Sequence, residues 1–213
     1  MLLIGMFDSP FVRRVAVSLH WLRIEFEHAD WSVGRDFERI RHYNPLVRVP
    51  TLVLDDAEML CESAAILDYL DERVGAPRAL LPALGKPRRY AKNLMAIAMG
   101  AADFGRDSVY ERVFRPADKR HAPWVERRQT QMHGALAWLE RECQALGEAQ
   151  WLIDGQFSQA DISLACAYTF LNDSQKPGGL DARHPALARL AERCEQLPEF
   201  KRTRVAFAPP RDS

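Results

Sequence analysis

Strand-like and helix-like patterns alternate through about the first 75 residues of this chain, and no strand-like pattern follows beyond them. Short apolar or alternating runs indicate strands, whereas apolar residues that recur every three or four positions indicate helices. The sequence therefore predicts an α/β domain followed by an all-helical domain. In the first domain we expect strands and helices in the order 2–5 (strand), 10–22 (helix), 25–31 (strand), 36–42 (helix), 51–54 and 58–60 (a hairpin) and 63–74 (helix).

The resulting β-α-β-α-β-β-α order is that of a thioredoxin-like domain. A stretch with several Gly and Pro residues separates this domain from the rest of the chain. We therefore predict a thioredoxin-like domain at 1–76, a linker at 77–86 and an all-helical domain at 87–213. The tail Ala208-Pro209-Pro210 carries no packing signal. The helices expected after the linker lie at 88–114, at 123–146, from 158 onward, at 185–196 and at 198–204.

Composition and charge exclude several classes of partner. The chain of 213 residues has 29 Lys and Arg against 29 Asp and Glu, so its formal net charge of +0 gives no reason to expect nucleic acid or a charged membrane as a partner. No apolar run reaches the ~18 residues that a membrane span needs. The N-terminus lacks the basic region of a signal peptide. We therefore expect a cytoplasmic protein.

The four cysteines, Cys61, Cys143, Cys166 and Cys194, are widely spaced. None forms a Cys-x-x-Cys pair, and no histidine stands at a metal-ligand spacing beside them. We therefore expect reduced thiols buried in the protein and no bound metal.

Ser9 stands directly before the first predicted helix and is followed by Pro10, so it is a natural N-cap. On this evidence alone a structural cap outweighs a catalytic role. The catalytic alternative is a hydroxyl that donates to a bound thiol. A free thiol has a pKa near ~8.5 and is mostly protonated at neutral pH. A hydroxyl, the helix dipole and the free amides of the first turn would all favour its thiolate.

Two further motifs stand at the starts of elements. Pro50 precedes a strand, which is common for a turn proline. In thioredoxin-like folds a proline at this point is cis, and the N–H and C=O of the preceding residue, here Val49, are then free to pair with an extended peptide. Glu62 and Ser63 open a helix, and a helix cap is their simplest explanation. Free amides at a helix N-terminus also bind anions, and an adjacent carboxylate binds an ammonium, so the pair suits a zwitterionic amino-acid head group.

Four motifs stand in order along the chain and together resemble one family. They are Ser-Pro-Phe-x-x-Arg at 9–14, Val-Pro at 49–50, Glu-Ser at 62–63 and a capping box at 158–161, in which Asp161 replaces the usual Glu. Over the whole chain they resemble the serine-type cytosolic glutathione transferases, and in particular bacterial glutathione transferase-like proteins that carry Ser-Pro-x-Val-Arg-Arg.

This resemblance implies roles for individual residues. Ser9 is implied to activate the thiol of glutathione. Val49 would pair with the cysteinyl unit, and Ser63 would hold the γ-glutamyl carboxylate. Glu62 would hold the neighbouring ammonium group. Arg48 would reach the glycyl carboxylate, and a solvated surface charge is its more common alternative. The full glutathione-binding set that we expect is Phe11, Arg48, Val49, Pro50, Glu62 and Ser63.

The resemblance also implies a pocket for a second substrate between the two domains. We expect it to be lined, beside Phe11, by residues of the first long helix. Helical spacing supports only a shared face for these residues, and a core role for Phe104 is an equal alternative. The residues expected from this helix are Asp103, Phe104, Asp107 and Tyr110.

The implied function is an enzyme that conjugates glutathione to a small hydrophobic electrophile in detoxification, or that reduces organic hydroperoxides. Ser9 stands where glutaredoxin-like classes have Cys, which argues against disulfide exchange. The alternatives are a non-catalytic glutathione-binding or protein-interaction module of the same fold and a glutathione-dependent isomerase. The family resemblance also implies a homodimer. Its candidate interface residues are Leu94, Ile97, Ala98 and Ala101.

Overall fold

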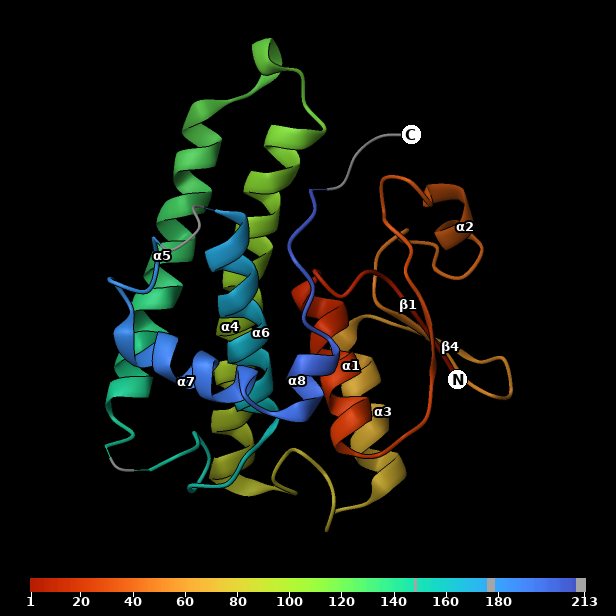
Figure 1. Ribbon diagram of the computed structural model, residues 1–213, viewed down its shortest axis with the longest axis vertical. Helices are drawn as coiled ribbons and strands as arrows, with labels where there is room; N and C mark the ends of the chain where they lie inside the picture. Colours follow the sequence, from red (N-terminus) through yellow and green to blue (C-terminus); the bar gives the residue numbers. More distant parts are fainter. Residues whose placement is uncertain (148, 176–178, 210–213) are drawn as a thin grey trace.

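The computed structural model describes residues 1–147, 149–175 and 179–209. As the sequence predicted, a four-stranded mixed sheet with helices comes first and an all-helical part follows (Figure 1). The elements of the first part are β1 (Leu2–Ile4), α1 (Pro10–Trp21), β2 (Glu27–Ala29), α2 (Phe37–Arg41), β3 (Thr51–Val53), β4 (Met59–Cys61) and α3 (Ser63–Val74).

The strands of the sheet lie in the order β2-β1-β3-β4. β1 is central, because it pairs in parallel with β2 and antiparallel with β3, and β3 and β4 form the expected hairpin. The strand expected at 25–31 is shorter in the structure, where β2 spans only Glu27–Ala29. Its partner β1 offers only three residues for pairing. The second hairpin strand extends to Cys61, which pairs with Thr51.

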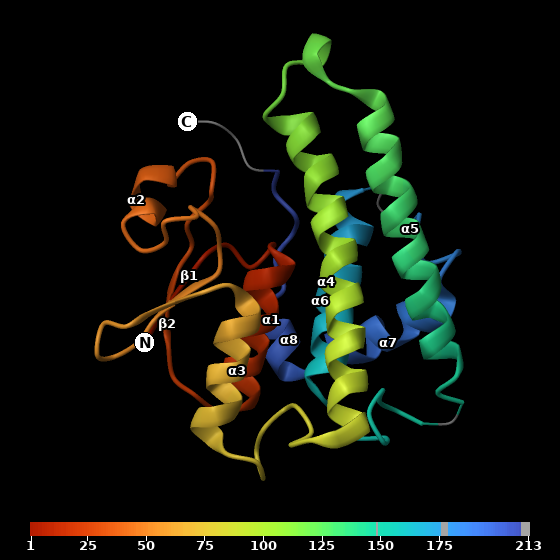
Figure 2. The same ribbon diagram turned by 180° about the vertical axis from the view of Figure 1, so that it is seen from behind.

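Helices α1 and α3 lie between the sheet and the helical part (Figure 2). α1 packs against β1 and α3 on one side and against α6 (Gln159–Ser174) of the helical part on the other. Almost the whole helix is therefore buried, including the two adjacent arginines Arg13 and Arg14. This position places the N-terminus of α1 at the boundary between the two parts of the chain.

The helical part is built around α6, with α4 and α5 as a long antiparallel pair beside it (Figures 1 and 2). α6 begins with the predicted capping box, because Asp161 Oδ2 accepts from the amide and the hydroxyl of Ser158 at 2.9 and 2.8 Å. α4 begins at Gly85, inside the predicted linker, and the exact domain boundaries stay a prediction. The elements are α4 (Gly85–Val113), the 3-10 turn η1 (Ala117–Lys119), α5 (Ala122–Gln144), α6 (Gln159–Ser174), α7 (Pro185–Glu195) and α8 (Pro198–Arg202).

α4 and α6 pack closely against each other at Gly105. A Cβ atom on Gly105 would lie 2.2 Å from Cδ2 of Leu171. The missing side chain therefore lets the two helices pack together. On the same helix, Leu94, Ala98 and Ala101 are fully buried within the chain. They are thus not available for the subunit interface that the sequence suggested.

The four cysteines are free thiols, of which Cys143, Cys166 and Cys194 are buried and Cys61 is partly buried. Burial raises the pKa of Cys143 and of Cys166 to about 12, so these thiols stay protonated at neutral pH. Over the described ranges, no helix is both long enough and apolar enough to cross a membrane. Within the same ranges, no group of three or more His, Cys, Asp or Glu side chains is arranged to hold a metal ion.

Candidate active site

A cleft of about 790 Å³ opens between the α/β part and the helical part. One wall consists of the N-terminus of α1, the loops that follow β2 and precede β3, and Glu62. α4 and α6 form the opposite wall, and the end of the chain contributes Phe207 and Ala208. The cleft therefore brings together segments from both ends of the sequence.

Ser9 lines this cleft at the N-terminus of α1. Its Oγ accepts from the amide of Val12 at 3.5 Å, which is long for a capping hydrogen bond. Within the described residues this is the only hydrogen bond of that oxygen, so the hydroxyl proton is available to a ligand. First-turn amides of a helix have no intrahelical acceptor, so they add further free donors at the same place.

The loop before β3 presents Arg48 and Val49 to the cleft. The Val49–Pro50 peptide bond is cis, as predicted, and Pro50 itself is buried. Asn44 holds this loop, because its buried side-chain amide donates to the carbonyl of Arg48 at 2.9 Å and to Thr51 Oγ1 at 3.1 Å. Sequence analysis missed Asn44, although the Asn-Pro dipeptide that it begins is a turn signal.

Glu62 lines the cleft directly before α3. Its backbone φ is +69°, a value that side-chain-bearing residues rarely adopt. Its exposed carboxylate lies 3.6 Å from Nη1 of Arg48, which is also exposed. Strain of this kind persists only where the surrounding structure imposes it, and it is concentrated at functional sites.

Ser63 is the first residue of α3, is 1% exposed and does not line the cleft. Its Oγ accepts from Nη2 of Arg14 at 2.7 Å, and its own proton is free to donate. Arg14 is 4% exposed, and it also donates to the hydroxyl of Ser163 of α6 at 3.4 Å. Burial lowers the pKa of Arg14 to about 10, so it remains charged at neutral pH. A buried guanidinium that has no ion pair within the described residues therefore lies next to the first turn of α3.

Asp103, Asp107 and Tyr110 of α4 line the opposite wall, near Phe11 of α1. Arg106 lies among them and forms ion pairs with Asp103 at 2.6 Å and with Asp107 at 3.0 Å. Its guanidinium carbon lies 5.8 Å from the ring centroids of both Phe11 and Tyr110. Burial raises the pKa of Asp103 and of Tyr110. This wall therefore combines aromatic rings with a largely self-neutralised set of charges.

The structure places Phe104 outside the cleft, in the packing between α4 and α5. The guanidinium carbon of Arg128, on α5, lies 5.2 Å from the centre of the Phe104 ring. Consecutive helical residues point about 100° apart, so Asp103 and Asp107 share a face that Phe104 does not. Spacing alone did not settle this, because it fixes which residues share a face but not where that face points.

Several lining residues have no motif in the sequence. Although the tail carries no packing signal in the sequence, the amide of Ala208 donates to Asp8 Oδ2 at 3.0 Å. The neighbouring Phe207 packs edge-on against Phe170 of α6, with ring centroids 5.7 Å apart. Pro210 lies outside the described residues. No local pattern would have found these contacts, since an extended tail packs only through partners distant in sequence. The aromatic lining residues that the sequence did not single out include Phe114, Phe170 and Phe207.

Comparison with known proteins gives consistent matches along the chain. Residues 3–78 match the family model "Glutathione S-transferase, N-terminal domain", and residues 122–193 match "Glutathione S-transferase, C-terminal domain". An uncharacterized GST-like protein of Escherichia coli K12, YibF, is 29% identical over 208 residues, which are 95% of this chain and 98% of YibF.

Two solved structures extend this similarity to the fold. A glutathione S-transferase of Methylobacterium radiotolerans, in complex with glutathione sulfonate, has a TM-score of 0.88 and 28% identity over 97% of this chain and 95% of the other. A glutathione transferase family member of Pseudomonas fluorescens Pf-5, with bound glutathione, has a TM-score of 0.84 and 31% identity over 97% of this chain and 99% of the other.

Proposed function

Because this chain belongs to the glutathione S-transferase family, we propose that it binds reduced glutathione, activates the thiol with Ser9 and conjugates it to a small hydrophobic electrophile. The sulfur forms a bond to the electrophilic carbon, and either a leaving group departs or the adduct takes up a proton. Reduction of an organic hydroperoxide by the same thiolate is a proposed second activity. The observation that carries the proposal is the free donor of Ser9, which shares one cleft with Val49 and Glu62.

The proposed chemistry depends on the N-terminus of α1. A thiol near Ser9 would receive a hydrogen bond from the hydroxyl and would lie close to the positive end of the helix dipole. Both interactions favour the thiolate over the thiol, so they lower the pKa of bound glutathione. Ser9 need not lose its own proton for this, which makes the role chemically reasonable for a serine.

We propose that the peptide is held by three further elements. The backbone of Val49 pairs with the cysteinyl unit, and the Glu62 carboxylate binds the ammonium group. Ser63 and the first-turn amides of α3 hold the γ-glutamyl carboxylate, with support from the charge of Arg14. Arg48 is proposed for the glycyl carboxylate, and the neighbouring Phe11 and Pro50 complete the set. Because the Ser63 hydroxyl already accepts from Arg14, it would act on the carboxylate as a donor.

The second substrate is proposed to lie against the wall formed by α4, beside Phe11 and Tyr110. Asp103 and Asp107 border this region, whereas Phe104 is no longer part of the proposal, because it packs toward α5. Tyr110, Phe114, Phe170 and Phe207 are among the residues that line the cleft. This supports an electrophile with an apolar or aromatic body.

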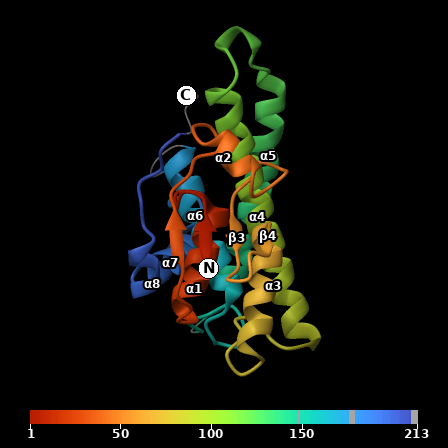
Figure 3. The ribbon, with the colours of Figure 1, turned by 90° about the vertical axis from the view of Figure 1, so that its right-hand side faces the viewer.

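We further propose a homodimer and a cytoplasmic location, where glutathione is kept reduced. The face that we propose for the second copy includes the edge strand β4, where Met59 is 48% exposed, and the neighbouring helix α3 (Figure 3). Ala64 and Ala65 of α3 and Ala96 of α4 are exposed and small, so they would let helices of two copies approach closely. Sedimentation that shows only a monomer at micromolar concentration would overturn the dimer.

Glutathione binding and turnover test the central proposal separately. Calorimetry should detect binding of reduced glutathione, and absence of binding would overturn the proposal. A panel of aryl halides, conjugated carbonyl compounds and organic hydroperoxides should then reveal turnover. Binding without turnover on any of these would favour the non-catalytic module, and turnover confined to isomerisation substrates would favour the isomerase.

A further inference from the structure

We propose that Asp8 anchors the C-terminal segment Arg204–Pro209 beside the cleft, so that Phe207 limits how long a second substrate the cleft accepts. Asp8 would be a positioning residue, since it acts through Phe207 rather than on the substrate. The inference about substrate length rests on the proposed function, whereas the anchoring itself does not.

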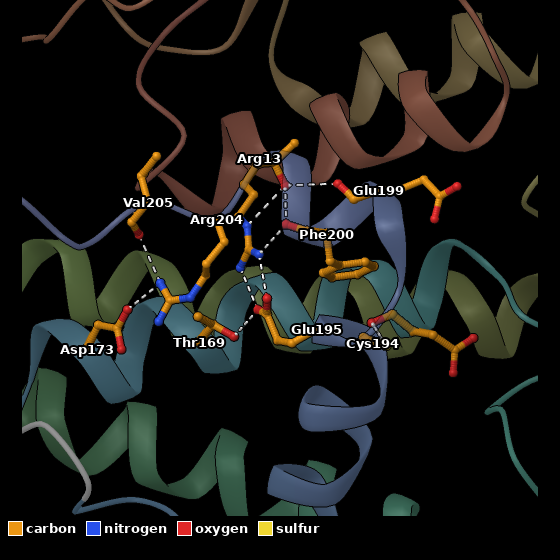
Figure 4. Close-up of polar contacts among 11 residues, drawn as sticks. Arg13, Thr169, Asp173, Cys194, Glu195, Glu199, Phe200, Arg204 and Val205 are labelled. Atoms are coloured by element: carbon orange, nitrogen blue, oxygen red, sulfur yellow. Dashed lines mark hydrogen bonds and ion pairs between the residues drawn. The ribbon is translucent and has the colours of Figure 1, made fainter.

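The segment is attached at both of its ends. At its start, Arg204 pairs with Asp173 of α6 at 2.7 Å and donates to the carbonyl of Val205 at 2.9 Å (Figure 4). Near its end, the amide of Ala208 donates to Asp8 Oδ2 at 3.0 Å. Between these two points Phe207 is the one residue that is partly buried rather than exposed. Loss of the second attachment would thus leave the ring held only by its own packing.

Phe207 lies where it can act on a ligand. It lines the same cleft as Ser9, Phe11 and Tyr110, and its ring packs edge-on against Phe170. The segment is thus connected to Asp8, the residue directly before the proposed thiol-activating serine. A substituent on a sulfur at Ser9 that is long enough to reach this aromatic pair would meet the Phe207 ring.

The hydrogen bond between Asp8 and the segment can break without unfolding the rest of the protein. The segment forms no helix or strand, and all of its residues other than Phe207 are exposed. Segments with few buried apolar contacts open locally at low cost in free energy. Burial raises the pKa of Asp8, and the amide of Ala208 opposes that shift, so the amide stabilises the carboxylate form. Asp8 and the tail therefore stabilise each other.

The anchor can be tested without any ligand. Hydrogen exchange of the C-terminal peptide, measured by mass spectrometry on the full chain, should be about tenfold faster in Asp8→Ala, which lacks a hydrogen bond to a charged group. Asp8→Asn keeps an acceptor oxygen and should give an intermediate rate. Asp30→Asn is the matched control, because it removes a neighbouring negative charge without touching the tail, and its exchange should be unchanged. Equal exchange in Asp8→Ala and wild type would overturn the anchor.

The substrate limit is tested by binding of S-methyl-, S-butyl-, S-hexyl- and S-octylglutathione, measured by calorimetry. Relative to S-methylglutathione, the longest ligands should bind at least about fivefold better to Phe207→Ala and Asp8→Ala than to wild type, because the barrier to the alkyl chain is removed. Any disturbance of Ser9 affects all four ligands and cancels in this ratio. Val205→Ala, in the same segment but outside the cleft, should match wild type.

An unchanged ratio in Phe207→Ala, or weaker binding of the long ligands, would overturn the limit while leaving the proposed function intact. If wild type bound no S-methylglutathione, the proposed function would fail and the limit with it. The hydrogen-exchange experiment would still test whether Asp8 anchors the C-terminal segment.

Discussion

The guanidinium of Arg13 in α1 makes a two-pronged ion pair with the carboxylate of Glu195 in α7, with N···O distances of 2.6 and 2.7 Å (Figure 4). Arg13 is 4% and Glu195 20% exposed. Arg13 also donates to the carbonyl of Phe200, and Glu195 accepts from the hydroxyl of Thr169. The pair thus joins the α/β part to the helical part.

Glu195→Ala should destabilise the protein strongly, because it leaves the charge of Arg13 buried without its partner. We expect the free energy of unfolding in urea to fall by about 3–5 kcal/mol. Glu38→Ala removes one partner of an exposed pair with Arg41 and should cost less than about 1 kcal/mol. Similar losses in the two variants would show that the pair between the two parts contributes little.

Ser9→Ala should reduce the proposed turnover far more than it weakens glutathione binding. The lost hydrogen bond to a charged sulfur corresponds to ~1.5–3 kcal/mol, so kcat should fall ~10- to 100-fold. Ultraviolet absorbance should show less thiolate in the glutathione complex at neutral pH. Ser9→Thr keeps the hydroxyl and serves as the control. Unchanged rate and thiolate absorbance would leave Ser9 as a helix cap only.

Ser63→Ala should have the opposite kinetic effect and mainly raise the KM for glutathione, since it weakens ground and transition states alike. It should also lower stability by about 1–3 kcal/mol, because buried Arg14 loses its 2.7 Å acceptor. In the background of Arg14→Met the same substitution should cost clearly less stability, and additive losses in the double variant would contradict the coupling.

Gly105→Ala should destabilise the protein, because the new Cβ would lie 2.2 Å from Leu171 Cδ2 and force α4 and α6 apart. The expected loss in unfolding free energy is about 1–3 kcal/mol. Gly134→Ala is the matched control, because a Cβ at this site in α5 meets nothing within 4 Å. That variant should gain up to about 1 kcal/mol from helix propensity, and a gain in both would contradict the close packing.

Stability should fall on mild acidification because of His184. Both of its ring nitrogens are buried without a hydrogen-bond partner in the part of the chain that the structure describes. Burial lowers the pKa of His184, opposed by Glu140 and reinforced by His133 and Arg183. The unfolded chain therefore binds the proton more readily, so stability is complete above about pH 6.5 and falls as the pH decreases below it.

Urea unfolding between about pH 7.5 and 5 measures this fall. His184→Gln should make the pH dependence shallower, whereas His121→Gln, at an exposed position, should leave it as in wild type. An unchanged slope in His184→Gln would contradict the assignment.

The order of the elements and the starts of α1, α3 and α6 followed from the sequence because these features depend on local interactions. Ser9 caps α1 through the amide of Val12, and Ser158 and Asp161 satisfy each other across one helical turn. α3 runs from Ser63 to Val74, as the apolar spacing predicted. Capping and helical periodicity involve residues only a few positions apart, so a single sequence carries them in full.

What each side chain faces was decided only by the tertiary structure. Phe104 and Arg106 lie two positions apart on α4 and so point to different sides of the helix. The packing of α4 against α5 and α6 decides which of the two faces the cleft. Arg14 resembles a surface residue until α3 and α6 enclose it, and Ala208 binds Asp8 across 200 positions of sequence. Such contacts depend on where separate elements meet in space, and local sequence patterns contain no information about that.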